Sequence, residues 1–446
     1  MGVFRAYDIR GIYNKEITEK LFEQIGKSLD VLGKAKKLVI GEDMRNSSNS
    51  LKKAVIRGAT QIGIDVIDIG LASTPMLYQA THDIKVDLGI IITASHNPKE
   101  YNGMKICRAN AVPISYETGI GLIEANIKHK KFKNSTLRGK VVKNLTFKEQ
   151  YIKQMSSYGK PKRKLTIVLD TGNGMGGYVD YDILKKYAKI IPLYTKLDGN
   201  FPNHEANPIK EKNIIDLSRK VIEEKADFGV AFDGDADRIG LVDERGKYVG
   251  ADVFGAFLIE YYIKKYPKEK TYSYDLRSTK CIQELLDSHN KKGLKTRVGH
   301  SYIKELMRKN NSFFSMELSG HFYFWFGKNM VYDSSLRATI ELISAYCEKE
   351  KEISYYLKRY KKYPKSNEIN FSVSNKREIL LKIKKKFSGE KIEEIDGISI
   401  YSKFWWANIR ESNTEEILRL NIEAENKQTY DKKIKELTNV ILNKNI

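Results

Sequence analysis

Short runs of apolar residues recur along the chain, and each leads into a polar or glycine-rich loop and then a stretch of helical periodicity. Such runs occupy residues 37–41, 88–92, 165–170 and 227–232. Apolar strands that alternate with helices are typical of a buried, mostly parallel sheet covered by helices. Functional loops of open α/β sheets lie at the carboxyl ends of the strands, which is where these polar loops fall.

The rhythm of strand, loop and helix is too irregular for a solenoid and predicts several α/β domains in series. Boundaries in or next to charged stretches divide the chain into domains at residues 1–145, 146–246 and 247–362. The last segment, 363–446, combines four strand patterns with two helical ones. It predicts a smaller α+β domain.

The composition fits a globular protein and adds a strong positive charge. Of 446 residues, 41% are hydrophobic and 11% aromatic, which is enough for real cores. The 78 Lys and Arg residues exceed the 56 Asp and Glu residues and give a net charge of +22. This charge indicates either a polyanion-binding protein or a solvated, lysine-rich surface. We favour the second interpretation, because basic residues are spread along the whole chain and no RNA-binding signature is present.

The cysteines and the N-terminus indicate a cytoplasmic protein. Cys107, Cys281 and Cys347 are odd in number and widely spaced, so they predict neither a disulfide framework nor a CxxC metal site. Residues 1–11 carry charges where a signal peptide needs an apolar core. The longest apolar run, around 88–92, is far too short to span a membrane.

An acidic loop at residues 233–238 (DGDADR) follows one of the apolar strands. Its aspartates, Asp233, Asp235 and Asp237, alternate, so an extended loop would point all three carboxylates one way. Ligands that are all oxygen suit a hard cation such as Mg²⁺. An EF-hand is rejected, because its sixth position needs glycine and here is Arg238. The other alternative, a solvated acidic turn, explains neither the preceding strand nor the adjacent arginine.

A serine lies in the loop after the apolar run 88–92. Residues 93–98 read TASHNP, and the Asn-Pro step predicts a turn that exposes Ser95 at the end of the strand. In isolation, Ser95 would be interpreted as an ordinary turn or N-cap serine. No Gly-x-Ser-x-Gly elbow is present, so an acyl-transfer hydrolase is not supported.

A glycine-rich loop at residues 170–177 (DTGNGMGG) satisfies the dinucleotide-binding pattern after a strand. The signal is weak, because the acidic residue beyond it, Asp198, lies in a loop-like stretch. A tight strand-to-helix turn that needs positive φ angles is the favoured alternative.

A polar loop at residues 410–414 (RESNT) lies between two predicted strands of the last domain. An arginine fork with neighbouring hydroxyl and amide donors is a good phosphate cradle. An ordinary hairpin loop is an equally good interpretation of the loop by itself.

Taken in order, these loops resemble those of the α-D-phosphohexomutases over essentially the whole chain. Residues 93–98 match the phosphoserine loop, 233–238 the metal loop, 317–321 (ELSGH) the sugar-binding loop and 410–414 the phosphate-binding loop. Residues 4–11 (FRAYDIRG) look like the start of the phosphomannomutase/phosphoglucomutase branch. Smaller matches lie at 101–105 (YNGMK) and 299–301 (GHS).

The resemblance implies three doubly wound α/β domains with mixed sheets and a smaller C-terminal α+β domain around a central cleft. Two departures stand out. The third domain reads Asp-Leu-Arg at 275–277 where relatives have Asp-x-Lys, and a proline common after Thr414 is replaced by glutamate. Arginine keeps the charge of lysine but changes its shape and reach.

The resemblance also assigns residues to roles. Mg²⁺ would be held by Asp233, Asp235, Asp237 and an oxygen on Ser95. The expected catalytic residues are Ser95, Lys105, Arg10, Arg238 and His321. The expected substrate-binding residues are Tyr7, Arg277, His300, Glu317, Ser319, Arg410, Ser412, Asn413 and Thr414.

The function implied by the resemblance is reversible phosphoryl transfer between the 1- and 6-positions of a hexose phosphate, mannose and/or glucose, through a phosphoserine and a hexose 1,6-bisphosphate. Phosphoglucosamine mutase is the alternative within the family, but its members usually begin Gly-Thr-Asp-Gly-Ile-Arg-Gly, unlike residues 7–10 here. We expect small hexose phosphates as partners, neither nucleic acid nor membrane, and a monomer or weak homo-oligomer. A polyanion-binding protein and a dinucleotide enzyme are the alternatives from other classes.

Overall fold

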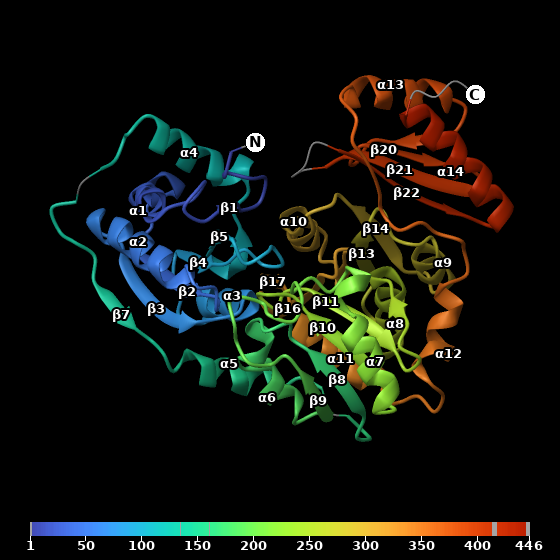
Figure 1. The fold of residues 1–446 in the computed structure, drawn as a ribbon, viewed down its shortest axis with the longest axis horizontal. Helices are drawn as coiled ribbons and strands as arrows, with labels where there is room; N and C mark the ends of the chain where they lie inside the picture. The colour runs from blue at the N-terminus through green and yellow to red at the C-terminus, as the bar shows by residue number, and fades with distance from the viewer. Residues whose placement is uncertain (1, 134, 160, 413–416, 443–446) are drawn as a thin grey trace.

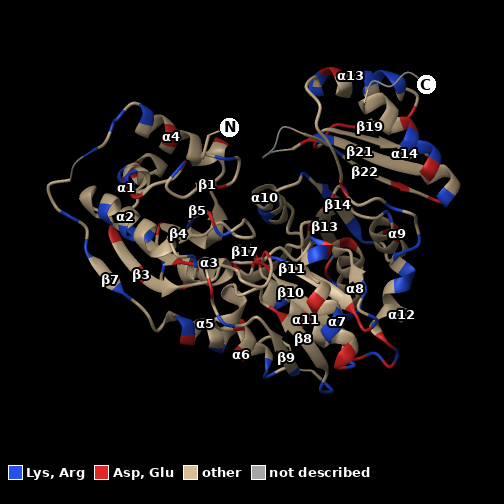
Figure 2. Cartoon of the chain, in the orientation of Figure 1, with Lys and Arg blue, Asp and Glu red and all other residues tan. Residues whose placement is uncertain are grey.

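The computed structural model describes residues 2–133, 135–159, 161–412 and 417–442, and it contains four sheets, each in its own segment of the chain (Figure 1). The predicted architecture of three α/β domains and a smaller fourth is confirmed. No helix among the described residues is long and apolar enough to cross a membrane. Lys and Arg are spread over helices and loops of all four domains (Figure 2). Short 3-10 or π segments lie at Leu29–Leu32, Ala109–Ala111, Tyr116–Ile120, Met175–Gly177, Glu211–Asn213 and Lys358–Tyr360.

The first domain has a parallel sheet with antiparallel strands at one edge. Its helices are α1 (Glu19–Lys27), α2 (Ser48–Gln61), α3 (Thr74–Asp83) and α4 (Gly121–Lys128). Its strands are β1 (Ile9–Ile12), β2 (Lys37–Glu42), β3 (Asp65–Leu71), β4 (Leu88–Ile92), β5 (Tyr101–Arg108), β6 (Val112–Pro113) and β7 (Val141–Lys143). They lie in the order β1-β5-β4-β2-β3-β7, with β6 beside β5. Strand β5 runs antiparallel to β4, so its residues return past the loop that follows β4.

The second domain places its acidic loop between two central strands. Its helices are α5 (Phe147–Met155), α6 (Asp180–Leu184) and α7 (Ile215–Glu223). Its strands are β8 (Thr166–Asp170), β9 (Lys189–Leu193), β10 (Phe228–Phe232), β11 (Ile239–Asp243) and β12 (Tyr248–Val249), in the order β12-β11-β10-β8-β9. Strands β10, β8 and β9 are parallel, and β11 returns antiparallel to β10. Residues 233–238 therefore form the connection between β10 and β11.

The third domain carries the sugar-loop motif between two short strands. Its helices are α8 (Ala251–Lys265), α9 (Cys281–Ser288), α10 (His300–Asn310), α11 (Ser335–Tyr346) and α12 (Ile353–Leu357). Its strands are β13 (Thr271–Asp275), β14 (Lys292–Thr296), β15 (Ser315–Met316), β16 (Phe322–Gly327) and β17 (Met330–Asp333), in the order β14-β13-β15-β16-β17. The motif at 317–321 fills the turn from β15 to β16.

The fourth domain is antiparallel throughout and has a separate core. Its elements are β18 (Ile369–Phe371), α13 (Lys376–Lys386), β19 (Lys391–Glu393), β20 (Ile398–Tyr401), β21 (Trp405–Glu411), β22 (Leu418–Ala424) and α14 (Lys427–Ile441), with strand order β18-β22-β21-β20-β19. Sequence patterns predicted all of these elements except β19, a three-residue edge strand with charged residues at both ends.

Helix α8 explains how the second and third domains are joined. Its sequence is apolar nearly all round, and such a helix is expected to be buried. It lies in one hydrophobic cluster that runs from the first domain through the third. The shared core holds the loops of these domains in fixed relation to one another, whereas the fourth domain adds its own core.

One buried carboxyl group in the second domain forms no ion pair with any residue that the structure describes. Asp180, the first residue of α6, is fully buried, and none of the described residues hydrogen-bonds to either of its carboxylate oxygens. Burial raises the pKa of Asp180 well above its usual value. Burial, and then the charge of Asp180, raise the pKa of the buried Tyr151 hydroxyl nearby. The folded state therefore favours a neutral Asp180.

We expect Asp180→Asn to stabilise the protein and to flatten the fall of stability with pH. In the unfolded chain this carboxyl has a pKa of about 4. Between that pH and the raised pKa of the folded state, the unfolded protein binds fewer protons than the folded protein, so the free energy of unfolding falls as the pH rises. Asparagine removes that ionisation, and each pKa unit is worth about 1.4 kcal/mol. Urea unfolding at about pH 5 and about pH 8 measures the effect.

The matched control is Asp182→Asn in the same helix. That side chain is exposed and pairs with Lys185 at 2.6 Å, so its removal should leave the pH dependence of the parent protein. Equal pH slopes for the parent and Asp180→Asn would contradict the assignment of a buried neutral acid.

Candidate active site

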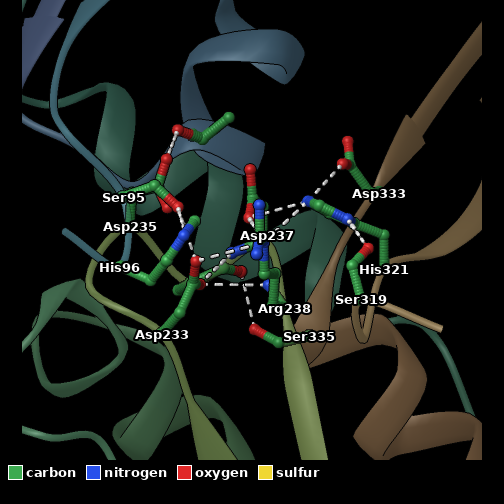
Figure 3. Close-up of polar contacts among 12 residues, drawn as sticks. Ser95, His96, Asp233, Asp235, Asp237, Arg238, Ser319, His321, Asp333 and Ser335 are labelled. Carbon is green, nitrogen blue, oxygen red and sulfur yellow. Dashed lines mark hydrogen bonds and ion pairs between the residues drawn. The ribbon is translucent and has the colours of Figure 1, made fainter. Parts of the chain in front are cut away.

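The predicted serine lies directly against the predicted acidic loop. Ser95 follows β4 in the expected turn and adopts a left-handed φ of 51°, with its backbone N–H donating to Thr93 Oγ1 at 2.9 Å. Its hydroxyl donates to Asp233 Oδ2 at 2.8 Å, across 138 positions in sequence (Figure 3). His96 Nδ1 lies 3.2 Å from the same hydroxyl. The prediction that the turn exposes Ser95 is wrong: the serine is 1% exposed, because the acidic loop packs against it at Gly234.

The three aspartates of the acidic loop converge. Asp233, Asp235 and Asp237 are buried, and each offers an oxygen within 4.8 Å of the others. Burial, and then the charges of Asp237 and Asp235, raise the pKa of Asp233 well above its usual value. Within the described part of the chain, Asp235 Oδ1 accepts no hydrogen bond. Converging oxygens with spare acceptor capacity fit a hard divalent cation, so this buried site could bind a metal ion.

A lysine ammonium supplies positive charge to this cluster. Lys105 lies on β5 opposite Ile91, and its Nζ donates to Asp235 Oδ2 at 2.6 Å and to Asp237 Oδ2. Burial disfavours its charged form, but Asp235 and Asp237 outweigh burial and raise the pKa of Lys105 well above its usual value. Thr74 also donates to Asp235 Oδ2, at 2.5 Å.

The acidic loop meets the third domain through Arg238 and His321, whose backbones form an isolated antiparallel bridge. Arg238 Nε lies 3.3 Å from His321 Nε2 and 3.8 Å from Asp233. His321 Nε2 lies 3.2 Å from Asp237 (Figure 3). The other ring nitrogen of His321, Nδ1, lies 3.1 Å from Glu317. Burial opposes the charged imidazole, but Asp237 outweighs burial and raises the pKa of His321 to about 9.

The sugar-loop residues surround the other side of this histidine. Ser319 Oγ lies 2.9 Å from His321 Nδ1, and Glu317 Oε1 accepts the backbone N–H of Gly299 at 3.0 Å. The His300 ring lies 6.4 Å from that of His321 and 5.7 Å from that of Tyr7, which comes from the first domain. The predicted Tyr7 and His300 are thus neighbours although 293 positions separate them in the printed sequence.

Three arginines gather around one glutamate where the third and fourth domains meet. Glu368 Oε2 accepts from Arg277 at 2.7 Å and from Arg410 at 3.0 Å, and Glu368 Oε1 accepts from Arg419 at 3.0 Å. Burial opposes ionisation of Glu368, but the charges of Arg277, Arg410 and Arg419 lower its pKa to about 2. The guanidinium of Arg277 is also clamped by Asp275.

Two predicted residues of the phosphate loop, Asn413 and Thr414, lie outside the described residues. The other two are described. Arg410 is buried at the end of β21, and Ser412 pairs through its backbone N–H with the carbonyl of Ile417 at 3.0 Å.

The described residues form one continuous line of contacts from the serine to the fourth domain. Arg277 Nη2 lies 3.9 Å from Glu317 Oε1 and closes the gap between the histidine group and the arginine cluster. Arg10 joins the line beside the serine by donating to Asn97 at 2.5 Å. The line runs in the order Ser95, Asp233, Arg238, His321, Glu317, Arg277, Glu368 and Arg410.

The sequence alone gave no reason to select several residues at this site. Thr74 and Glu368 stand in ordinary helix and strand patterns, and only their spatial partners reveal them. His96 was inside the quoted serine motif and adjacent to Ser95, so proximity in sequence was the available signal. Arg45 follows an apolar strand in the same way as the selected loops do.

The glycine-rich loop at 170–177 supports the acidic loop. Gly172 and Asn173 have left-handed φ angles of 50° and 60°, as a tight turn requires. The N–H of Met175 donates to the carbonyl of Gly234 at 2.9 Å, and a Cβ on Gly174 would lie 2.9 Å from Gly234 Cα. These contacts favour the tight-turn interpretation over the dinucleotide one.

Comparison with known proteins finds phosphoglucomutase/phosphomannomutase domains in succession: α/β/α domain I at residues 1–134, domain II at 149–246, domain III at 251–363 and the C-terminal domain at 368–439. The chain is 37% identical to a phosphomannomutase of Methanocaldococcus jannaschii, covering 98% of this chain and 97% of that one. It is 34% identical to a phosphomannomutase of Escherichia coli K12, covering 94% of each. The crystal structure of a phosphoglucomutase/phosphomannomutase family protein from Burkholderia thailandensis superposes with a TM-score of 0.90 at 26% identity, covering 98% of this chain and 96% of that chain.

Proposed function

The chain belongs to the α-D-phosphohexomutase family, in its phosphomannomutase branch, and from that premise we propose that it moves a phosphoryl group between the 1- and 6-positions of mannose and/or glucose phosphate, with Ser95 as carrier. The observation that supports this assignment best is the Ser95 hydroxyl, 2.8 Å from Asp233 in a buried acidic cluster. That cluster stands at one end of the line of contacts that reaches Arg410.

In the proposed reaction, a free sugar hydroxyl attacks the phosphorus carried on Ser95. A new P–O bond forms to the sugar as the bond to the serine oxygen breaks, and the hydroxyl proton leaves to a base. The product is a hexose 1,6-bisphosphate. The bisphosphate then reverses its orientation in the site. The serine oxygen attacks the other phosphorus, and the sugar oxygen that leaves regains a proton. Positioning and charge neutralisation account for most catalysis in such transfers.

The acidic cluster and the oxygen of Ser95 would hold Mg²⁺, which when bound neutralises charge on the transferring group. Two arginines lie where they can stabilise its equatorial oxygens. Arg238 lies 3.8 Å from Asp233, and Arg10 is hydrogen-bonded to Asn97 in the serine loop.

Lys105 and His321 are the proposed proton carriers. Each half-reaction needs a proton removed from one sugar oxygen or returned to another, and a positioned side chain does this best within hydrogen-bond reach. Both groups lie at the acidic cluster, Lys105 against Asp235 and His321 against Asp237. Glu317 also holds His321 from the opposite ring nitrogen.

The remaining predicted residues would hold the substrate. Glu317 and Ser319 would bind sugar hydroxyls, with Tyr7 and His300 beside them. The non-transferring phosphate would be held by Arg277, Arg410, Ser412, Asn413 and Thr414. Convergence of Arg277 and Arg410 on the Glu368 carboxylate supports this assignment, because that carboxylate is an anion placed between two of these guanidinium groups.

A side-by-side assay of mannose, glucose and glucosamine 1-phosphates, with each 6-phosphate product measured, tests the proposal. We expect turnover of the mannose and/or glucose substrate, stimulation by the matching 1,6-bisphosphate, and loss of activity on chelation that Mg²⁺ restores. Turnover of the glucosamine substrate alone would support the phosphoglucosamine mutase alternative. Absence of turnover for all three would contradict the proposed function.

The expectations about cellular location, partners and oligomeric state stay predictions from the sequence. They are a cytoplasmic location, small hexose phosphates as ligands without nucleic acid or membrane partners, and a monomeric or weakly self-associating state. The three cysteines are buried and unpaired, in keeping with a reducing compartment.

A further inference from the structure

Arg45 lies behind the serine loop and does not enter the mechanism above. It follows β2 in the first domain and is only 3% exposed. A buried guanidinium needs partners for its five N–H groups, because an unpaired buried donor costs folding free energy. The partners of Arg45 therefore show what it is for.

Four N–H groups of Arg45 donate hydrogen bonds to the loop that carries Ser95. Nη2 donates to the carbonyl oxygens of Ser95 at 2.8 Å and Asn97 at 2.7 Å. Nη1 donates to those of Pro98 at 2.8 Å and Tyr101 at 3.0 Å. Ser95, Asn97 and Pro98 lie in the turn between β4 and β5, and Tyr101 is the first residue of β5, so the guanidinium spans the turn and its junction with the strand. One side chain thus holds the backbone at the serine and at three positions after it.

The acidic side chain of Asp43 fixes the guanidinium from the other direction. Arg45 Nε forms an ion pair with Asp43 Oδ2 at 3.2 Å that lacks hydrogen-bond geometry, and Asp43 Oδ1 accepts from the Arg45 backbone at 3.0 Å and from Ser48 Oγ at 2.5 Å. The planar fork is consequently oriented at its base as well as at its tips. Lysine has three donors around a single point and could not reproduce this geometry.

The second domain covers the same guanidinium. The ring centroid of Phe201 lies 4.9 Å from the Arg45 guanidinium carbon, and Asn46 donates to Asn200 at 3.1 Å. A Cβ on Gly234, in the acidic loop, would lie 2.4 Å from the carbonyl oxygen of Ser95. The serine backbone is therefore packed between Arg45 and the loop that carries the aspartates.

From these contacts we infer that Arg45 is a positioning residue for phosphoryl transfer: it holds the 95–101 loop so that the Ser95 hydroxyl faces Asp233, and through Phe201 it ties that loop to the domain that carries the acidic cluster. The inference rests on the proposed function. A displacement of about 1 Å at a reacting group costs about 100-fold in rate. Arg45 touches no reacting atom, so its loss should lower kcat while leaving KM unchanged.

The test uses the full-length protein with Arg45→Lys and Arg45→Ala. We expect kcat to fall by about 100-fold in both variants, with KM for the hexose 1-phosphate within about twofold of the parent value. Intact-mass analysis after incubation with the 1,6-bisphosphate should show slower phosphorylation at Ser95. Added guanidinium ion, below concentrations that unfold the protein, should restore part of kcat in Arg45→Ala and none in Arg45→Lys.

Arg57→Lys is the matched control, because Arg57 is a half-exposed arginine of the same domain whose ion pair to Glu23 spans 3.3 Å. It should behave as the parent. Should Arg45→Lys not accumulate as folded protein, Phe201→Leu keeps the guanidinium and removes the ring from it, and kcat should fall about tenfold at unchanged KM.

Parental kcat in Arg45→Lys, or parental kcat in Phe201→Leu where the lysine variant does not fold, would overturn the inference. So would an Arg45→Ala defect that lies in KM alone or that guanidinium leaves untouched. Failure of the proposed function is distinct from either result, because in that case the parent protein itself would turn over none of the three hexose phosphates.

Discussion

Replacing Ser95 with alanine should lower turnover of the hexose phosphate by at least about 10⁴-fold, because loss of a covalent nucleophile removes the phosphoryl carrier itself. The protein should stay folded, since the change removes one hydroxyl and one hydrogen bond to Asp233. Intact-mass analysis of the parent after incubation with a hexose 1,6-bisphosphate should show one phosphate adduct, and the Ser95→Ala protein should show none.

Ser157→Ala controls for the loss of a serine hydroxyl. Ser157 lies just after α5, is exposed, and donates only to the carbonyl of Gln154 at 2.7 Å among the interactions described. This variant should keep both the turnover and the adduct of the parent. Full activity in Ser95→Ala, or an unchanged phosphate adduct, would refute the role of Ser95.

The second large effect is expected at the acidic cluster. Asp235→Asn keeps the shape of the side chain but removes one of the three converging charges, and we expect kcat to fall by at least about 100-fold, because metal-assisted charge neutralisation is worth several kcal/mol. A direct binding measurement accompanies the assay. Mg²⁺ should raise the melting temperature of the parent by mass action and have little effect on the variant.

Without metal, Asp235→Asn should stay folded but lose some stability. The change weakens the contact with the buried Lys105 ammonium, which keeps its second partner, Asp237. Asp182→Asn, the exposed control used for Asp180, should retain the Mg²⁺ response. If exhaustive chelation left the parent fully active, or if Asp235→Asn kept the parental response to Mg²⁺, the metal role of the cluster would be wrong.

The strand prediction succeeded where burial leaves a local pattern. Five consecutive apolar residues predicted a strand at 88–92, and β4 has those bounds. The same holds for the strand before the acidic loop, predicted from 227–232 and observed at Phe228–Phe232. In contrast, β19 was missed, because a three-residue edge strand with Lys391 and Glu393 at its ends has no apolar run to reveal it.

Candidate site residues divide in the same way. The aspartate triplet and the serine each carried a local signal, namely spacing after a buried strand. Glu368 carried none, and Arg45 shares the position after a buried strand but stands there as one charged residue, which is usually a solvated side chain. Their importance follows from partners such as Arg277 and Ser95, which lie in other segments of the chain.

The sequence by itself determined the α/β class, the existence of four domains and the loops with chemical potential, because burial periodicity and turn chemistry are local properties of the chain. The tertiary structure decided which loops meet. Ser95 reaches Asp233 across 138 positions only because the first three domains share a core, and Glu368 meets Arg277 only where the fourth domain packs on the third. Such contacts depend on how whole sheets pack, and no local pattern encodes that packing.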